Sequence, residues 1–269
     1  MIGTTTRRGN VMKSRAGELQ NRHDGSFAWK TLASILQCLP ALRGAWIAGA
    51  SLDENADALD LSGQGRTLNY NGGSYDYAGL VPFLSLGGGA PAYLNRLDEA
   101  GLDIVGTETG ITDKGLTIGG WFRFDRLTAN EFLIGKGTGA AATSSYFLQF
   151  RGDLANDPIR FAVSNGAAFD LVDVLITPAA SKWTFVCGRF EPSTEIKVWA
   201  AQSTLESTPN AAGIPAALGN NAADFTVGAF SGGANFLQGD ASAIFLCACR
   251  LSDALIASIW HHTRALYGH

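Results

Sequence analysis

Short segments in which apolar and polar residues alternate follow one another closely from Arg43 onward, and clusters of Gly, Asn, Asp and Ser separate them. Two segments show the alternation most clearly, 116–126 and 183–191. In the first, four apolar side chains share one face of the strand: Leu116, Ile118, Phe122 and Phe124. A period of two is typical of strands that place one face on a core. Because no helix-length segment lies between these strands, we predict an all-β sandwich of two antiparallel sheets.

The predicted strands are 44–48, 67–70, 80–86, 93–95, 116–126, 131–136, 146–151, 160–164, 169–175, 183–191, 195–200, 224–230 and 237–249. One helix is predicted on each side of this series. Ser26 can cap the first helix, whose apolar positions recur at helical spacing up to Leu39 before Pro40 ends it. Ser252 supplies the cap of the second helix, and Gly268 can end it.

The first 42 residues differ in character from the rest of the chain. Residues 1–30 carry six basic and two acidic side chains, although the whole chain has a net charge of −4. We interpret 1–42 as a basic arm plus an amphipathic helix used for assembly, and 43–269 as one sandwich domain. The residues expected to dock the arm on a neighbouring protein are Arg7, Arg8, Lys13, Arg15, Arg22 and Trp29. The alternatives are a solvated terminus and a helix that packs on its own sandwich.

The composition indicates a compact, turn-rich globular chain, with 46% hydrophobic and 16% charged residues. No apolar run is long enough to span a bilayer, and no secretion signal follows the first methionine. We expect all four cysteines to be buried and reduced, because each lies in an apolar stretch: Cys38, Cys187, Cys247 and Cys249. The last two have no second Cys or His pair at ligand spacing, so a zinc site is not favoured.

Five segments carry a resemblance to a known family. They are Trp46, Asp-Leu-Ser-Gly-Gln-Gly-Arg at 60–66, Gly-Leu-Thr-Ile-Gly-Gly-Trp-Phe at 115–122, the pair 183–186 and 196–199, and the closing strand and tail at 236–256. In this order they resemble the laminin-G-like, concanavalin-A-like jelly roll over about residues 43–267. The resemblance implies a two-sheet antiparallel jelly-roll sandwich, here with a basic arm and helix before it and a short helix after it.

The segment 60–66 has the chemistry of a tight turn. Asp60 and Ser62 can accept backbone N–H bonds, and the two glycines suit positive φ. In calcium-binding relatives the aspartate also helps to hold the metal, so the resemblance makes Asp60 and Asp240 the residues to test for calcium. The family often places an aspartate at the position of Ser242, so one expected ligand is missing. A structural turn without a cofactor is therefore the favoured interpretation.

No catalytic constellation is evident in the sequence. Retaining glycosidases on related sandwiches need paired carboxylates, whereas the acidic residues of the predicted strands stand singly, mostly at strand ends. The adjacent His261 and His262 diverge on a helix, and no nucleophile elbow or phosphate-binding glycine loop has its required context. We therefore expect the protein not to be an enzyme.

The whole pattern of arm, helix and jelly roll resembles laminin-G-containing virion proteins of tailed bacteriophages. This resemblance implies a non-enzymatic structural or accessory protein of the head or tail, located in the virion and made without a signal peptide. Its expected partners are other virion proteins or copies of itself, as a symmetric homo-oligomer. Nucleic acid is not an expected partner.

The alternative function is a lectin-like module that binds host surface glycans. Sugar recognition uses aromatic rings together with a few polar groups. The candidates are three tyrosines in a stretch rich in Asn, Gly and Ser that we predict to be mostly loop: Tyr70, Tyr75 and Tyr77. The aromatic residues of the predicted strands more often face a core: Trp121, Tyr146, Trp183 and Trp199.

Overall fold

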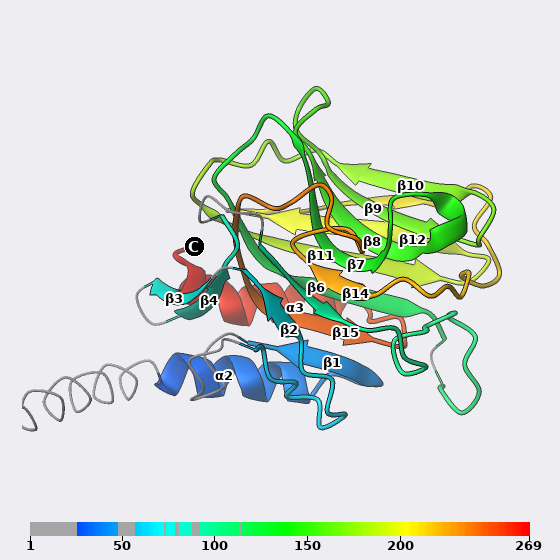
Figure 1. Ribbon diagram of the computed structural model, residues 1–269, viewed down its shortest axis with the longest axis horizontal. Coiled ribbons are helices and arrows are strands. Elements are labelled where there is room, and N and C mark those ends of the chain that lie inside the picture. Colours follow the sequence, from blue (N-terminus) through cyan, green and yellow to red (C-terminus); the bar gives the residue numbers. More distant parts are fainter. Residues whose placement is uncertain (1–25, 48–56, 73, 79–80, 88–91, 113) are drawn as a thin grey trace, which may run out of the picture.

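The computed structural model of the 269-residue chain describes residues 26–47, 57–72, 74–78, 81–87, 92–112 and 114–269. Within these ranges the fold consists of two antiparallel sheets with helices on one side (Figure 1). The predicted fold class is confirmed.

The eight-stranded sheet runs in the order β13 (Leu205–Asn210), β12 (Glu195–Ala201), β11 (Trp183–Glu191), β6 (Leu116–Phe124), β15 (Gly239–Cys247), β4 (Val81–Ser85) and β3 (Ser74–Ala78), and β1 (Leu42–Trp46) also pairs with β15. The seven-stranded sheet runs in the order β10 (Phe169–Val174), β9 (Ile159–Ser164), β8 (Ser144–Arg151), β7 (Asn130–Gly137), β14 (Phe225–Val227), β5 (Tyr93–Arg96) and β2 (Asn69–Asn71). A short 3-10 helix, η1 (Ala141–Thr143), precedes β8.

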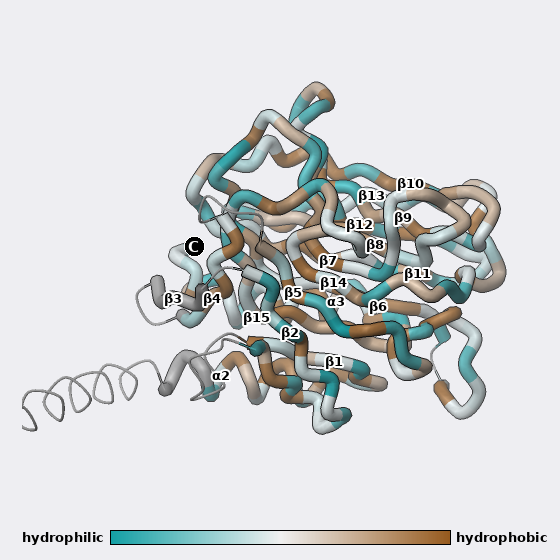
Figure 2. Tube along the Cα trace, in the orientation of Figure 1, coloured by the Kyte–Doolittle hydropathy of each residue, from teal (hydrophilic) through white to brown (hydrophobic). Residues whose placement is uncertain are grey.

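The main core lies between the two sheets, as the alternation in β6 and β11 predicts. Leu116, Ile118, Phe122 and Phe124 of β6 are fully buried in it, together with Val186 and Phe190 of β11. Figure 2 shows hydrophobic segments along the central strands of both sheets. Because successive strand residues point to opposite faces, the residues between these positions point out of the sandwich.

A second core lies on the outer face of the eight-stranded sheet. Trp121 of β6 and Phe185 of β11 point out from this face into a cluster that also contains residues of helix α2 (Ser26–Gln37) and helix α3 (Asp253–Thr263). Helix α2 contacts β1, β15 and β4 of this sheet. Leu32 and Leu36 of α2 are buried there, and each contributes about 2 kcal/mol of burial free energy. Of the placements considered for this helix, packing on its own sandwich is the one observed.

The C-terminal helix begins where the sequence predicts. The Ser252 side chain accepts a hydrogen bond from the backbone N–H of Leu255 at 3.2 Å, and so caps α3. A 3-10 turn, η2 (Arg264–Tyr267), follows, and Gly268 ends it with a left-handed φ of 83°. The ring of Tyr267 stacks on Trp121 with 4.2 Å between centroids, so this turn closes one end of the second core.

Two strands were missed by the sequence analysis, and one cysteine prediction is wrong. Strands β3 and β13 are short edge strands. β13 contains a proline and mostly polar residues, and β3 lies in a stretch rich in Asn, Gly and Ser that favours a loop. Cys187, Cys247 and Cys249 are buried in the second core and are not part of a disulfide, whereas Cys38 is exposed. Cys38 follows the last residue of α2, and only the preceding apolar face of that helix is covered.

No helix in the described part of the chain is long and apolar enough to cross a membrane.

Candidate functional site at one end of the sandwich

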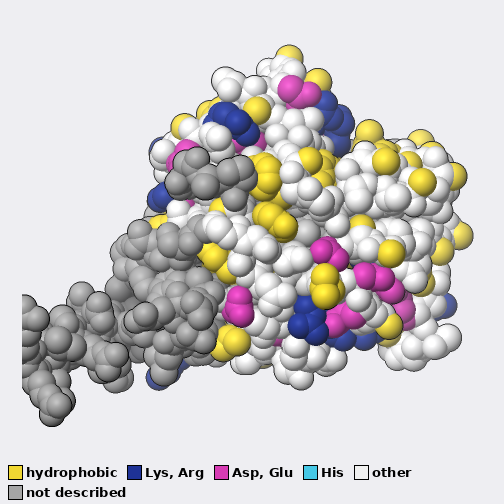
Figure 3. Space-filling view, in the orientation of Figure 1, with side chains coloured by type: hydrophobic (Ala, Val, Ile, Leu, Met, Phe, Trp, Pro, Cys, Tyr) yellow, Lys and Arg dark blue, Asp and Glu magenta, His cyan; other side chains and the backbone are white. Residues whose placement is uncertain are grey.

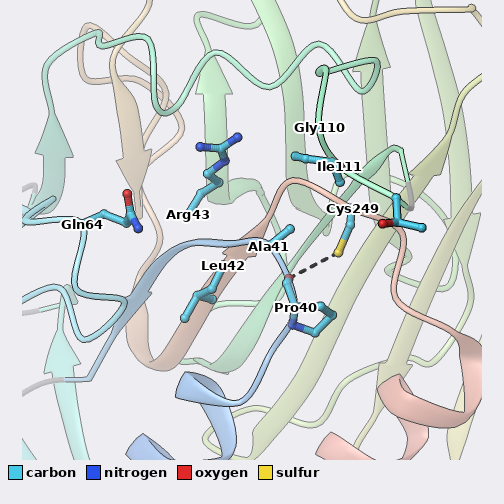
Figure 4. A pocket seen from close by; sticks show the side chains of 9 residues that line it. Pro40, Ala41, Leu42, Arg43, Gln64, Gly110, Ile111 and Cys249 are labelled. Carbon is cyan, nitrogen blue, oxygen red and sulfur yellow. Dashed lines mark hydrogen bonds between the residues drawn. The ribbon is translucent and has the colours of Figure 1, made fainter.

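An open pocket of about 470 Å³ lies at the end of the sandwich where β1 begins and β15 ends. The strand register brings these ends together, because Leu42 of β1 faces Cys247 of β15, and Cys247 faces Thr117 at the start of β6. Nine residues from four segments line the pocket: Pro40, Ala41, Leu42, Arg43, Gln64, Gly110, Ile111, Thr112 and Cys249. Figure 4 shows Gln64 and Arg43 on one side and Ile111 and Cys249 on the other, with Ala41 between them.

The lining combines hydrogen-bonding groups with a small apolar surface. Arg43 supplies a guanidinium, Gln64 an amide and Thr112 a hydroxyl, while Ile111 and Pro40 supply carbon surface. No carboxylate is among the nine lining residues, and none in the described part of the chain forms an ion pair with Arg43. Within the described residues the guanidinium has no ion-pair partner, so it can donate to a ligand that brings its own acceptors.

The turn at 60–66 builds the Gln64 side of the pocket. One oxygen of Asp60 accepts the backbone N–H groups of Ala45 at 3.2 Å and Ser62 at 2.8 Å. The other oxygen accepts the Ser62 hydroxyl at 2.7 Å and the backbone N–H of Arg66 at 2.9 Å. The Ser62 oxygen in turn accepts the N–H of Gln64 at 3.2 Å. Asp60 is thus the organiser of a well-satisfied turn, as the favoured interpretation of this motif has it.

The two residues proposed for calcium do not meet. Asp240 is buried on β15, where it is paired with Arg123 across to β6. Asp60 bridges to Trp46, which faces Ile244, so the two aspartates are separated by about 13 Å along β15 alone. Among the described residues no group of three or more His, Cys, Asp and Glu side chains is arranged to hold a metal ion.

Arg66 ties this wall of the pocket to the neighbouring loop. Its guanidinium donates to the backbone oxygen of Arg43 at 2.7 Å and to the Glu99 carboxylate at 2.6 Å. Its backbone oxygen accepts the indole N–H of the buried Trp46 at 2.7 Å. A Cβ at Gly101 would lie 1.8 Å from the guanidinium, so a larger residue there would push the Arg66 side chain out of this position.

The opposite wall is anchored to both cores. Ile111 packs against the main core and against the second core. Just before it, the Glu108 carboxylate accepts the backbone N–H groups of Val105 at 2.7 Å and Gly106 at 3.3 Å. Because both walls are held by hydrogen bonds and packing within the chain, the pocket is formed before any ligand arrives.

At the base of the pocket, the residues between α2 and β1 are hydrogen-bonded to the residues that follow β15. The thiol of Cys249 donates to the Pro40 oxygen at 3.3 Å, and the N–H of Ala248 donates to the Ala41 oxygen at 2.9 Å. Ala41 adopts a positive φ of 47°, which turns the chain from helix into β1. A non-glycine residue in this conformation shows that the surrounding contacts determine the backbone here.

The predicted tyrosine group lies on strands of different sheets. Tyr70 lies in β2 of the seven-stranded sheet, where its ring packs on the main core and its hydroxyl donates to the Ser85 oxygen at 2.7 Å. Tyr75 and Tyr77 lie in β3 of the eight-stranded sheet and are paired with Leu84 and Pro82. The structure therefore places all three on strands rather than in a loop.

The aromatic residues expected in cores are buried. Trp121, Trp183 and Trp199 lie in the second core, and Tyr146 lies in the main core. Of the predicted docking residues, Trp29 lies in α2, and the others lie outside the described residues: Arg7, Arg8, Lys13, Arg15 and Arg22.

The sequence analysis did not find the residues of the pocket. Arg43, Gln64, Ile111 and Cys249 are far apart in sequence and meet only through the strand register. The one local signal was the turn motif at 60–66, which was interpreted for its aspartate and not for Gln64 at its tip.

No protein-family model matches the chain, and no curated protein matches its sequence. Solved structures do match. The botulinum neurotoxin type G receptor binding domain matches with a TM-score of 0.55 and 10% identity over 82% of this chain and 51% of that one. The binding domain of Paraclostridial Mosquitocidal Protein 1 matches with a TM-score of 0.57 and 10% identity over 83% of this chain and 52% of that one. The chain thus spans about half the length of these toxin binding domains.

Domain 4 of AbnA, a GH43 extracellular arabinanase from Geobacillus stearothermophilus, was solved in complex with arabinotriose. It matches with a TM-score of 0.54 and 10% identity over 81% of this chain and 97% of that one. They share a fold. At such low identity the similarity shows the β sandwich alone, and the pocket residues must be interpreted by their own chemistry.

Proposed function

We propose that the chain is a non-enzymatic recognition module that binds a saccharide in the pocket between Arg43, Gln64 and Ile111. The observation that carries the proposal is the guanidinium of Arg43, which has no ion-pair partner among the described residues, at a preformed pocket with no carboxylate among its nine described lining residues. The similarity to receptor-binding domains of toxins and to an arabinotriose-bound domain supports a binding role for this fold.

A saccharide suits the pocket because its hydroxyls need donors and acceptors while its C–H faces need apolar surface. Arg43 can donate two parallel hydrogen bonds, and the Gln64 amide can donate and accept. Ile111 and Pro40 offer the carbon surface. Since Arg43 is the sole charged group among the nine described lining residues, we expect sugars that carry a carboxylate to bind more tightly than neutral ones.

The strand carboxylates support a role without catalysis. Glu131 is paired with Arg126, Glu195 with Arg189, and Glu191 with Arg250. None of these acids lines the pocket, whereas glycoside hydrolysis needs two carboxyl groups about 5 to 10 Å apart on either side of the bond.

The second part of the proposal is that the module is displayed on a larger particle, as a head or tail component of a bacteriophage virion. The sequence resemblance to such virion proteins supports it. Because α2 belongs to the second core, we assign the anchoring role to the residues before Ser26, which bind other virion proteins or further copies of this chain. On the face in Figure 3, acidic and basic side chains lie side by side, which suits a protein partner better than nucleic acid.

The binding proposal is tested with a glycan array and titration of the best glycans. Arg43→Ala should weaken binding about 10- to 100-fold, because a hydrogen bond from a charged group contributes about 1.5 to 3 kcal/mol. Lys182→Ala is the matched control, since it removes an exposed positive charge outside the pocket. Unchanged affinity in both Arg43→Ala and Gln64→Ala would remove the pocket from the proposal, and turnover of a glycan would remove its non-enzymatic part.

The display proposal is tested by deleting residues 1–25, which leaves α2 in place. The shortened chain should keep its cooperative unfolding transition and its glycan binding but lose assembly, measured as its mass in solution and its incorporation into particles. Assembly equal to that of the full chain would contradict an anchoring role for this segment.

A further inference from the structure

Lys136 points into the sandwich from the end of β7. Its register partners are Tyr146 of β8 and Phe225 of β14, and both of these side chains lie in the main core. The Lys136 side chain is only 1% exposed. A lysine in this position would carry a large desolvation cost unless its charge were compensated on the spot.

Four oxygen atoms surround the ammonium group. The Lys136 nitrogen lies 2.5 Å from a carboxylate oxygen of Asp98 and 3.0 Å from one of Asp103. It also donates to the backbone oxygens of Asn221 at 2.5 Å and Ala223 at 2.8 Å. The aspartates come from the segment between β5 and β6, and the carbonyls come from the segment before β14. One buried charge therefore joins two connecting segments to β7.

Two carboxylates with backbone carbonyls form the donor set that proteins use for hard cations, above all Ca²⁺. Lysine offers one positive charge to two negative ones, so the four oxygens without it would form a site of charge −2. Asp103 also keeps one carboxylate oxygen buried without a hydrogen-bond partner, although the Lys136 nitrogen is near it. The four oxygens are thus arranged as in a cation-binding site, in which the Lys136 ammonium group takes the place of the cation.

We propose that Lys136 is an internal substitute for a metal ion. Its ammonium group holds the two connecting segments at this end of the sandwich in place, so that their order does not depend on bound calcium. This inference does not depend on the proposed saccharide function. It differs from a calcium site at Asp60 and Asp240, because neither of those residues takes part.

Lys136 also influences the pocket, because the segment that it holds continues along the chain into one pocket wall. The segment that supplies Asp98 and Asp103 also supplies Glu99, the partner of Arg66, and continues to Ile111 in the pocket wall. The hydroxyl of Tyr146 donates to the Leu102 oxygen at 2.8 Å, so the same segment is fixed from the core side as well. A lysine at this position therefore keeps one pocket wall ordered without a dissociable ligand.

The test uses the full chain and measures the melting temperature in EDTA and in 5 mM CaCl₂ for the wild type and for Lys136→Ala. The wild type should melt at the same temperature in both solutions. Lys136→Ala should melt lower in EDTA and recover with calcium, which should bind once per chain with a dissociation constant at or below about 1 mM. The matched control adds Asp98→Asn and Asp103→Asn to Lys136→Ala, and it should lose the calcium response.

A Lys136→Ala chain that is folded but neither binds Ca²⁺ in calorimetry nor gains stability from it overturns the proposal. If the variant is unfolded in EDTA, the readout is refolding on addition of CaCl₂. Recovery of a cooperative transition supports the proposal, and a chain that stays unfolded in calcium overturns it. A wild type that calcium stabilises through Asp98 and Asp103 also overturns it.

Discussion

Glu131 gives the fold a pH dependence whose sign and size follow from its surroundings. Its side chain is fully buried in β7, and this burial raises the pKa of Glu131 from 4.5 to about 7. Arg126, whose Nε lies 2.8 Å from a carboxylate oxygen, and the backbone N–H of Gln238 at 3.2 Å lower the pKa but do not offset the desolvation. The folded protein therefore holds a proton on Glu131 that the unfolded chain releases between pH 4.5 and 7.

The sign of the effect is fixed by which state binds more protons. A raised carboxyl pKa stabilises the folded state fully below the unfolded pKa of 4.5, and this stabilisation is lost as the pH rises through about 7. The size of the shift corresponds to a loss on the order of 3 kcal/mol. Glu131→Gln removes the titration while keeping a side-chain oxygen for the Gln238 N–H, so the variant should not lose this amount.

The assay is urea unfolding of the wild type and Glu131→Gln from pH 4 to pH 9. The quantity to compare is the difference between their free energies of unfolding, in which the titration of all other groups cancels. We expect Glu131→Gln to become more stable relative to the wild type by about 3 kcal/mol between pH 4.5 and 8. A difference that stays constant over this range would refute the reasoning, as would a carboxyl titration in the folded state with its midpoint near 4.5.

Two further predictions concern the pocket wall and the thiols. Gly101→Ala should lower the free energy of unfolding in urea by about 2 kcal/mol, because the new Cβ displaces the Arg66 guanidinium from Glu99 and from the Arg43 oxygen; an unchanged value would show that the loop can move aside. A thiol reagent should modify one cysteine per native chain, Cys38, and all four after unfolding, since the other three thiols are buried and burial raises the pKa of Cys247. Rapid reaction of two or more native thiols would contradict the second core as described.

The central strands could be predicted from the sequence because large apolar residues recur at every second position on the face that packs in the main core. The bounds of β11 agree with the prediction at both ends, and the predicted apolar face of β6 is the one in the main core. Edge strands are harder to predict: β13 is largely exposed and polar, and β3 is only five residues long.

The residues of the candidate sites could not be predicted from the sequence, because they are far apart along the chain. Lys136 appears in the sequence as an ordinary polar residue at the end of a strand, and its two aspartates and two carbonyls lie 33 or more positions away along the chain. The pairing of β14 with both β7 and β5 brings them to it, because Phe225 faces Lys136 on one side and Arg96 on the other. Likewise, Arg43 marked the start of the predicted domain, but its place in a pocket, without an ion-pair partner among the described residues, can be recognised only once its neighbours in space are known.

The packing of α2 decides where this molecule can be cut. A fragment beginning at Arg43, the boundary that the sequence suggests, would lose Leu32, Leu36 and Leu39 from above the eight-stranded sheet. The apolar side chains of β1, β4 and β15 that α2 contacts would then be exposed to water, and fragments with such an exposed apolar surface typically precipitate or self-associate. A shortened protein that stays folded and does not aggregate should therefore begin at or before Ser26, and any fusion partner should be attached before that residue.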